Sequence, residues 1–143
     1  MPNVYTPQTI TLFVVAIVFA AMILFAIILT RRRSSGLNIE KYRSDWLKVE
    51  NSLSSSNLMT YQMAILNADK LLDRALKDLG VSGETMGDRL KASSSRFSDI
   101  NQVWTVHKLR NRIAHETDVH INLIVAKKAI YVYKKSLKDL GAI

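Results

Sequence analysis

The sequence predicts an all-α protein in which one N-terminal transmembrane helix precedes an antiparallel four-helix bundle with a short extra helix. Three observations lead to this prediction. An uncharged apolar run lies near the N-terminus, four later segments repeat apolar residues at helical spacing, and no segment shows the two-residue period of a β-strand. The 143-residue chain leaves about 110 residues after the run, enough for one helical core.

The apolar run covers residues 10–30, and its only polar side chains belong to two threonines. A helix of this length extends about 30 Å, which matches the hydrocarbon thickness of a bilayer. The run lacks the polar stripe of a soluble helix, and no basic residue precedes it as in a secretory signal. We therefore expect residues 10–30 to cross a membrane, with residues 1–9 as a short extracytoplasmic segment.

Three consecutive arginines, Arg31, Arg32 and Arg33, follow the apolar run directly. Basic residues flank transmembrane helices on the cytoplasmic side. We therefore expect a single-pass protein with its N-terminus outside, a basic juxtamembrane linker at 31–37, and a cytoplasmic domain at 38–143. The three arginines act in this interpretation as a membrane-anchor flank that contacts lipid headgroups.

The first two bundle helices follow the linker. The first begins after Asn38, a residue type that caps helices, and its apolar residues alternate at spacings of three and four. These residues are Ile39, Tyr42, Trp46, Val49 and Leu53. The second helix has a broad apolar face from about residue 57 to 79, and Gly80 ends it. A short helical piece capped by Ser82 comes next.

The last two bundle helices occupy the C-terminal third of the chain. One is capped by Ser98 and continues to about residue 116, and the other covers about 122–140 and ends at Gly141. The final helix places an apolar stripe at alternating spacings of three and four, with its lysines mostly off that stripe. Because the connections are short, we expect neighbouring helices to be antiparallel.

Composition excludes several kinds of site. The chain has no cysteine, so disulfides, zinc fingers and thiolate catalysis are excluded. Its three histidines form no pattern with carboxylates, and no glycine-rich phosphate loop is present, so we expect neither a metal nor a cofactor. The net charge of +8 includes the three arginines at 31–33, so the domain after them carries +5. This moderate basicity suits RNA or an anionic lipid surface, and equally a merely soluble domain.

One constellation has the residue types for chemistry: Arg110, Asn111 and His115, near the end of the penultimate helix. This R-N-x-x-x-H pattern resembles the signature of the HEPN superfamily of small helical-bundle domains. The whole chain is also similar to a group of small single-pass bacterial membrane proteins with no settled activity. The HEPN resemblance implies a metal-independent endoribonuclease that acts as a homodimer, with two motifs facing one groove.

The residue types suit RNA cleavage because RNA supplies its own nucleophile, the 2′-hydroxyl. His115 would transfer protons and Arg110 would stabilise the charge that develops on phosphate, with Asn111 orienting the histidine or the phosphate. Arg110 and His115 are separated by about 140° around an ideal helix, so one protomer does not present both on one face. A two-fold dimer would overcome that separation.

Other interpretations of the same residues stay open. In a purely structural alternative, Arg110 pairs with a carboxylate of another helix, Asn111 hydrogen-bonds to the backbone, and His115 stabilises the C-terminal end of the helix. The competing function is a non-catalytic membrane-tethered scaffold that binds a protein partner or a nucleotide. In a third interpretation, the arginine run and the lysine-rich last helix bind anionic lipid. The expected partners are membrane lipid, RNA, a second copy of the chain and an unknown protein.

Overall fold

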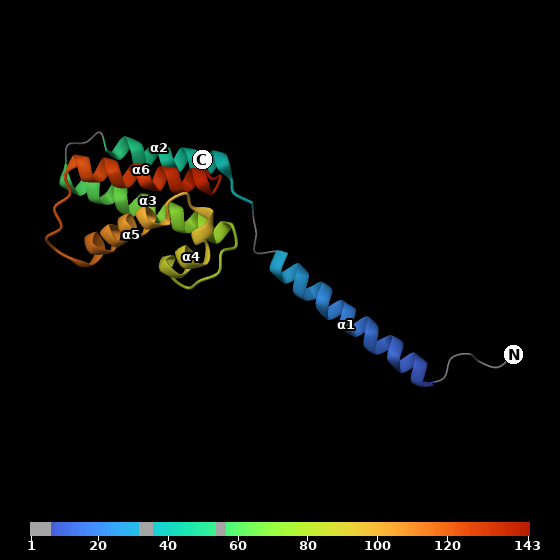
Figure 1. The fold of residues 1–143 in the computed structure, drawn as a ribbon. Coiled ribbons are helices and arrows are strands. Elements are labelled where there is room, and N and C mark those ends of the chain that lie inside the picture. The colour runs from blue at the N-terminus through green and yellow to red at the C-terminus, as the bar shows by residue number, and fades with distance from the viewer. Residues whose placement is uncertain (1–6, 32–35, 54–56) are drawn as a thin grey trace. The chain divides into compact units, whose positions relative to one another are not determined.

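The computed structural model describes residues 7–31, 36–53 and 57–143, and every regular element in these ranges is a helix. The chain divides into two compact units, Met1–Ser34 and Ser35–Ile143. Figure 1 shows the helices of both units. The prediction of a helical fold without strands is confirmed for the described part of the chain.

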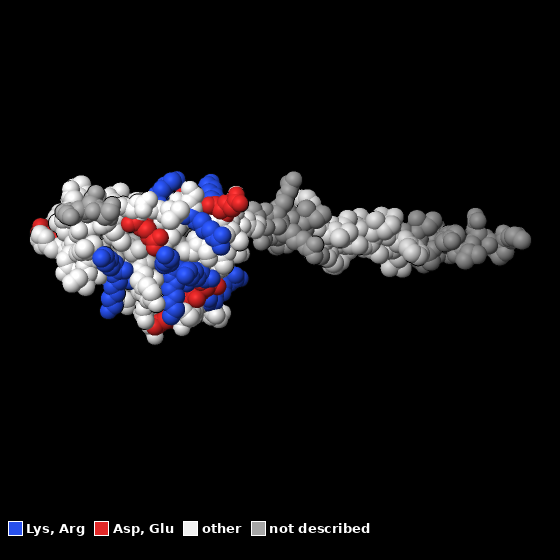
Figure 2. All heavy atoms as spheres, turned by 90° about the horizontal axis from the view of Figure 1, so that it is seen from above, with Lys and Arg blue, Asp and Glu red and all other residues white. Residues whose placement is uncertain are grey.

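The first unit contains helix α1, Pro7–Arg31. Its side chains are described for residues 11–26, and all of them are exposed although almost all are apolar. Figure 2 shows neither acidic nor basic side chains among the described atoms of this helix. The side chains described for α1, at residues 11–26, therefore carry no charge.

The predicted transmembrane helix at 10–30 is wrong. Across 7–31, 36–53 and 57–143, no helix meets the combined length and apolarity needed to cross a bilayer. The predicted single-pass localisation, with an external N-terminus and a cytoplasmic domain, was derived from that helix and is therefore wrong as well.

The predicted membrane-anchor flank loses its basis for the same reason. Arg32 and Arg33 lie outside the described residues, and the side chain of Arg31 is likewise not described.

The second unit is the predicted helical bundle. Helix α3, Leu58–Asp78, packs against α2, Ile39–Ser52, against α5, Ile100–His115, and against α6, Leu123–Asp139. These four helices alternate in direction, as Figure 1 shows. The short helix α4, Met86–Ala92, and a 3₁₀ turn connect α3 to α5. The antiparallel bundle and its extra helix therefore agree with the sequence pattern.

Helix capping accounts for the helix starts. Asn38 caps α2, as predicted, by accepting a hydrogen bond from Lys41 N at 3.0 Å. Helix α4 begins after Thr85 rather than Ser82, because Thr85 and Asp88 form a reciprocal capping box. The cap of the penultimate helix also differs from prediction.

That helix, α5, is capped by Asp99 instead of Ser98. The Asp99 carboxylate accepts a hydrogen bond from Gln102 N at 3.1 Å. The Ser98 hydroxyl donates instead to Asp139 at 2.8 Å, which ties the start of α5 to the end of α6. Gly80 and Gly141 follow α3 and α6 with φ of 72° and 69°, the left-handed conformation expected at helix ends.

The core lies between the four long helices, with α3 at its centre. Its largest fully buried apolar side chains come from α2, α3, α4 and α6. They are Tyr42, Ile65, Leu72, Leu76, Leu90, Tyr133 and Leu137. One buried residue of α3 breaks the apolar pattern: Asp69 is only 3% exposed. A carboxylate at this depth requires hydrogen-bonded or charged partners.

Candidate functional site

A groove of about 1170 Å³ lies between α3, α4 and α5, and we call it the motif groove. Arg110 and Asn111 of the predicted site line it, together with Asp69 and His107. Three lysines also line it: Lys70, Lys91 and Lys108. The structure therefore brings two of the three predicted site residues into one cavity.

The floor of the motif groove is built around Asp69. Its Oδ1 lies 2.8 Å from His107 Nδ1 and accepts a hydrogen bond from the Tyr133 hydroxyl at 3.1 Å. These contacts connect α3 with α5 and α6. Burial and the neighbouring Asp69 charge raise the pKa of Tyr133 well above its ordinary value, so the phenol stays a neutral donor.

Arg110 is attached to the same carboxylate. Its Nε lies 3.3 Å from Asp69 Oδ2, an ion pair in which the N–H lacks hydrogen-bond alignment. Its Nη1 donates to Asn111 Oδ1 at 3.1 Å. The Arg110 side chain is still 33% exposed, and its Nη2 has no hydrogen bond to a described residue. The guanidinium is thus held on one edge and open to solvent on another.

Asn111 completes a closed circuit of polar contacts. Its Nδ2 lies 3.3 Å from His107 Nε2, one helical turn earlier on α5. Asp69, His107, Asn111 and Arg110 therefore form a ring, which we call the polar ring. The Trp104 and His107 rings pack in a T-shaped arrangement, with ring centroids 6.0 Å apart.

His115 lies outside the motif groove. It is the last residue of α5, and its exposed side chain makes no hydrogen bond within 7–31, 36–53 or 57–143. The predicted triad is therefore divided: Arg110 and Asn111 are adjacent, whereas His115 lies at the end of the helix. The angular separation expected from helical geometry accounts for this division.

Sequence reasoning missed the residues that hold the motif in place. The structural alternative for Arg110, a carboxylate on another helix, corresponds to Asp69, but neither that aspartate nor Tyr133 was identified. A signal for Asp69 was present, because it follows Ile65 by four residues and precedes Leu72 by three, a position on the buried stripe of α3. His107, which contacts Asp69, is buried at 7% exposed.

The carboxylates of the motif groove are all occupied by partners within the protein. Asp69 belongs to the polar ring, and Asp88 belongs to the α4 capping box. Hydrogen bonds from Thr85 lower the pKa of Asp88. Asp73 pairs with buried Arg89 at 2.7 Å and with Lys77 at 2.7 Å.

Unlike these carboxylates, the lysines of the motif groove have no ion-pair partner among the described residues. These lysines, Lys70, Lys91 and Lys108, are exposed. With the carboxylates already engaged, the uncompensated charge at the groove is positive. Such a groove favours an anionic ligand.

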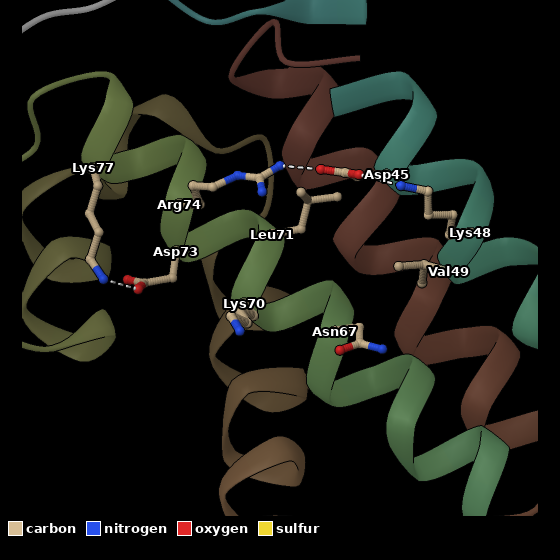
Figure 3. Close-up of a pocket in the computed structure, with 9 residues that line it drawn as sticks. All are labelled: Asp45, Lys48, Val49, Asn67, Lys70, Leu71, Asp73, Arg74 and Lys77. Atoms are coloured by element: carbon tan, nitrogen blue, oxygen red, sulfur yellow. Dashed lines mark hydrogen bonds and ion pairs between the residues drawn. The ribbon is translucent and has the colours of Figure 1, made fainter. Parts of the chain in front are cut away.

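A second groove, about 450 Å³ in volume, is lined by residues of α2 and α3. Its charged residues differ from those of the motif groove because most of them are paired. Figure 3 shows that its charged residues mostly face one another. Asp45 bonds Arg74 at 2.6 Å and Lys48 at 3.0 Å, and Asp73 bonds Lys77. Figure 2 likewise shows basic and acidic side chains interspersed on the bundle face seen from above. Arg74 of the second groove is also partly exposed, at 39%, but its Nη2 donates a hydrogen bond to the Asp45 carboxylate at 2.6 Å.

Within the described ranges, no group of three or more histidine, cysteine, aspartate or glutamate residues has the arrangement of a metal site. Comparison of the chain with protein-family models, curated proteins and solved structures finds no match. The resemblance to the HEPN superfamily therefore stays a prediction, supported by the R-N-x-x-x-H motif and the bundle helix that contains it.

Proposed function

We propose that the helical unit, residues 35–143, is a HEPN-like RNA-binding domain that cleaves RNA as a homodimer without a metal ion. Arg110, Asn111 and His115 are its reacting groups. The observation that supports this most is the state of Arg110, whose guanidinium is fixed by the polar ring at a positively charged groove and remains one-third exposed.

A fixed, partly exposed guanidinium suits phosphate chemistry. Arginine stays charged at all relevant pH values and donates several hydrogen bonds in one plane. Because the polar ring already orders it, little side-chain freedom is lost when phosphate binds. Lys70, Lys91 and Lys108 would attract the neighbouring phosphates of the same strand.

The position of His115 requires a second copy of the chain. In one protomer this histidine does not line the groove that contains Arg110. A two-fold axis near the end of α5 would bring His115 of each protomer to the Arg110 groove of the other. Each site would then take its phosphate-binding groups from one protomer and its proton-transfer group from the partner.

The test uses the purified full chain with fluorescent RNA in excess chelator. We expect cleavage by the wild type and a loss of about 100-fold or more in Arg110→Ala and in His115→Ala. The matched control is His120→Ala, because His120 is also exposed and lies outside the motif. If the folded wild type leaves RNA intact, or if His115→Ala cleaves as fast as wild type, the ribonuclease proposal is wrong.

A second function is favoured by two specific observations. Asp69 already neutralises part of the Arg110 charge, and His115 is absent from the groove lining. Both facts suit a non-catalytic module that binds a protein partner or a nucleotide. Binding of RNA or nucleotide without any cleavage by a verified dimer would select this alternative.

A further inference from the structure

We infer that Asp69 and His107 are positioning residues that lock Arg110 and Asn111 into one phosphate-binding unit, with His107 held as the neutral Nδ1–H tautomer. The role in RNA cleavage rests on the proposed function, whereas the tautomer follows from the polar ring alone. Neither Asp69 nor His107 belongs to the R-N-x-x-x-H motif.

The tautomer follows from donor and acceptor matching around the ring. Arg110 is a donor only, so its bond to Asn111 must end on the amide oxygen. The Asn111 amide nitrogen then faces His107 Nε2 at 3.3 Å and is itself a donor. Nε2 must therefore carry no proton, and the imidazole proton resides on Nδ1, where it donates to Asp69 Oδ1 at 2.8 Å.

Each member of the ring satisfies its neighbours only in this arrangement. If Nε2 carried a proton, two donors would meet between His107 and Asn111. If the Asn111 amide turned to accept that proton, two donors would meet between Asn111 and Arg110 instead. A part-buried pair of facing donors is unfavourable, so the ring selects one protonation state and one amide orientation.

The consequence for the motif is that Arg110 is held from two sides. Asp69 Oδ2 attracts its Nε edge directly, and Asn111 Oδ1 accepts from Nη1. Asn111 is in turn kept in the correct orientation by His107, which Asp69 holds. One buried carboxylate on α3 thus controls both motif residues on α5, directly for Arg110 and through His107 for Asn111.

His107 acts through its neighbours rather than on RNA. Its Nε2 is engaged by Asn111, its Nδ1 by Asp69, and its side chain is almost fully buried. A proton-transfer group needs a free nitrogen within reach of the substrate. His107 has none while the ring is closed, so we assign it a positioning role and leave proton transfer to His115.

The first test needs no RNA. Nitrogen-15 NMR of the imidazoles in the full-length protein at neutral pH should show His107 with a protonated Nδ1 and an unprotonated Nε2. The opposite tautomer, or a doubly protonated ring, would overturn the inference whether or not the protein cleaves RNA. Failure of the inference is therefore distinguishable from failure of the proposed function.

The second test separates positioning from folding with two near-isosteric variants. His107→Gln places an acceptor near the Nε2 position and keeps the bond to Asn111, whereas His107→Asn keeps only a donor toward Asp69. We expect kcat for RNA to fall about tenfold or more in His107→Asn with KM little changed, and to stay within about threefold of wild type in His107→Gln. Thermal unfolding of both variants establishes that they fold.

Equal losses of kcat in two equally stable variants would contradict the positioning role, because the bond to Asn111 would then be irrelevant. A wild type with the expected tautomer that cleaves no RNA would overturn the proposed function and, with it, the assignment of Asp69 and His107 to an RNA site.

Discussion

Arg110 and His115 belong to one short motif on one helix, yet their surroundings are opposite. Arg110 contacts a buried carboxylate of α3 and a neighbouring amide, whereas His115 ends α5 with an exposed ring. The difference shows that a motif in sequence is not yet a site in space. Partners on other helices decide which motif residues are fixed and which are left for a second molecule.

The largest effect expected from this contrast is on Asp69. Asp69→Ala leaves His107, Arg110 and Tyr133 without their shared buried acceptor, and breaking a buried ion pair from one side costs about 3–5 kcal/mol. Urea unfolding should therefore show a loss of this size. Asp118→Ala, at an exposed aspartate with no ion pair to a described residue, is the control and should change stability by less than about 0.5 kcal/mol.

The next effect tests whether burial, rather than pairing itself, produces such losses. Arg89 and Lys77 both pair with Asp73, but Arg89 is buried and Lys77 is exposed. We expect Arg89→Met to cost about 3 kcal/mol of unfolding free energy and Lys77→Met less than about 0.5 kcal/mol. Similar costs for the two variants would show that burial does not determine the cost of losing an ion pair. The contrast between buried and exposed residues would then lose its energetic basis.

A smaller effect is expected at Tyr133. Tyr133→Phe removes one hydrogen bond to Asp69 while His107 and Arg110 remain, so the loss should be about 1 kcal/mol at neutral pH. Tyr131→Phe is the matched control, since Tyr131 lies on the same helix with an exposed side chain. Guanidinium unfolding of both variants provides the comparison.

The same tyrosine also predicts a pH dependence. Its folded-state pKa lies well above the unfolded value of about 10, so its contribution to stability is complete below pH 10 and is lost as pH rises further. Tyr42 adds to this loss between pH 10 and 12, because burial and its bond to Asp78 raise its pKa to about 12. Tyr133→Phe should therefore reduce the alkaline loss of stability; an unchanged profile would contradict its place beside Asp69.

Much of the bundle was predictable from the sequence because apolar spacing and helix caps are local properties. Asn38, Gly80 and Gly141 act as expected, whereas the start of α5 moved by one residue because Ser98 bonds α6. The transmembrane assignment at 10–30 was wrong, because no helix in the described part of the chain is long and apolar enough to cross a bilayer.

The candidate site was only half predictable, and the reason is distance along the chain. Arg110 and Asn111 are neighbours, so their pairing is local. Asp69 precedes His107 by 38 residues and Tyr133 by 64, and only tertiary packing brings them together. An aspartate on an otherwise apolar stripe was the available indication that a buried polar partner existed on another helix.

The smallest effect on stability belongs to His115. Because its ring is exposed and unbonded within the described residues, His115→Ala should change the free energy of unfolding by less than about 0.5 kcal/mol. A loss above about 2 kcal/mol in thermal or urea unfolding would show that His115 is a structural residue and would remove the contrast with Arg110.

The most direct test of the account asks whether one site is shared by two protomers. Arg110→Ala and His115→Ala are each inactive in the proposal, but a mixed dimer contains one groove with an intact Arg110 that faces an intact His115 of the partner. Random mixing makes about half of the dimers mixed, each with one of two sites restored, so RNA cleavage should recover to about a quarter of the wild-type rate. If native mass spectrometry shows mixed dimers and cleavage stays at the level of the separate variants, the shared site is contradicted.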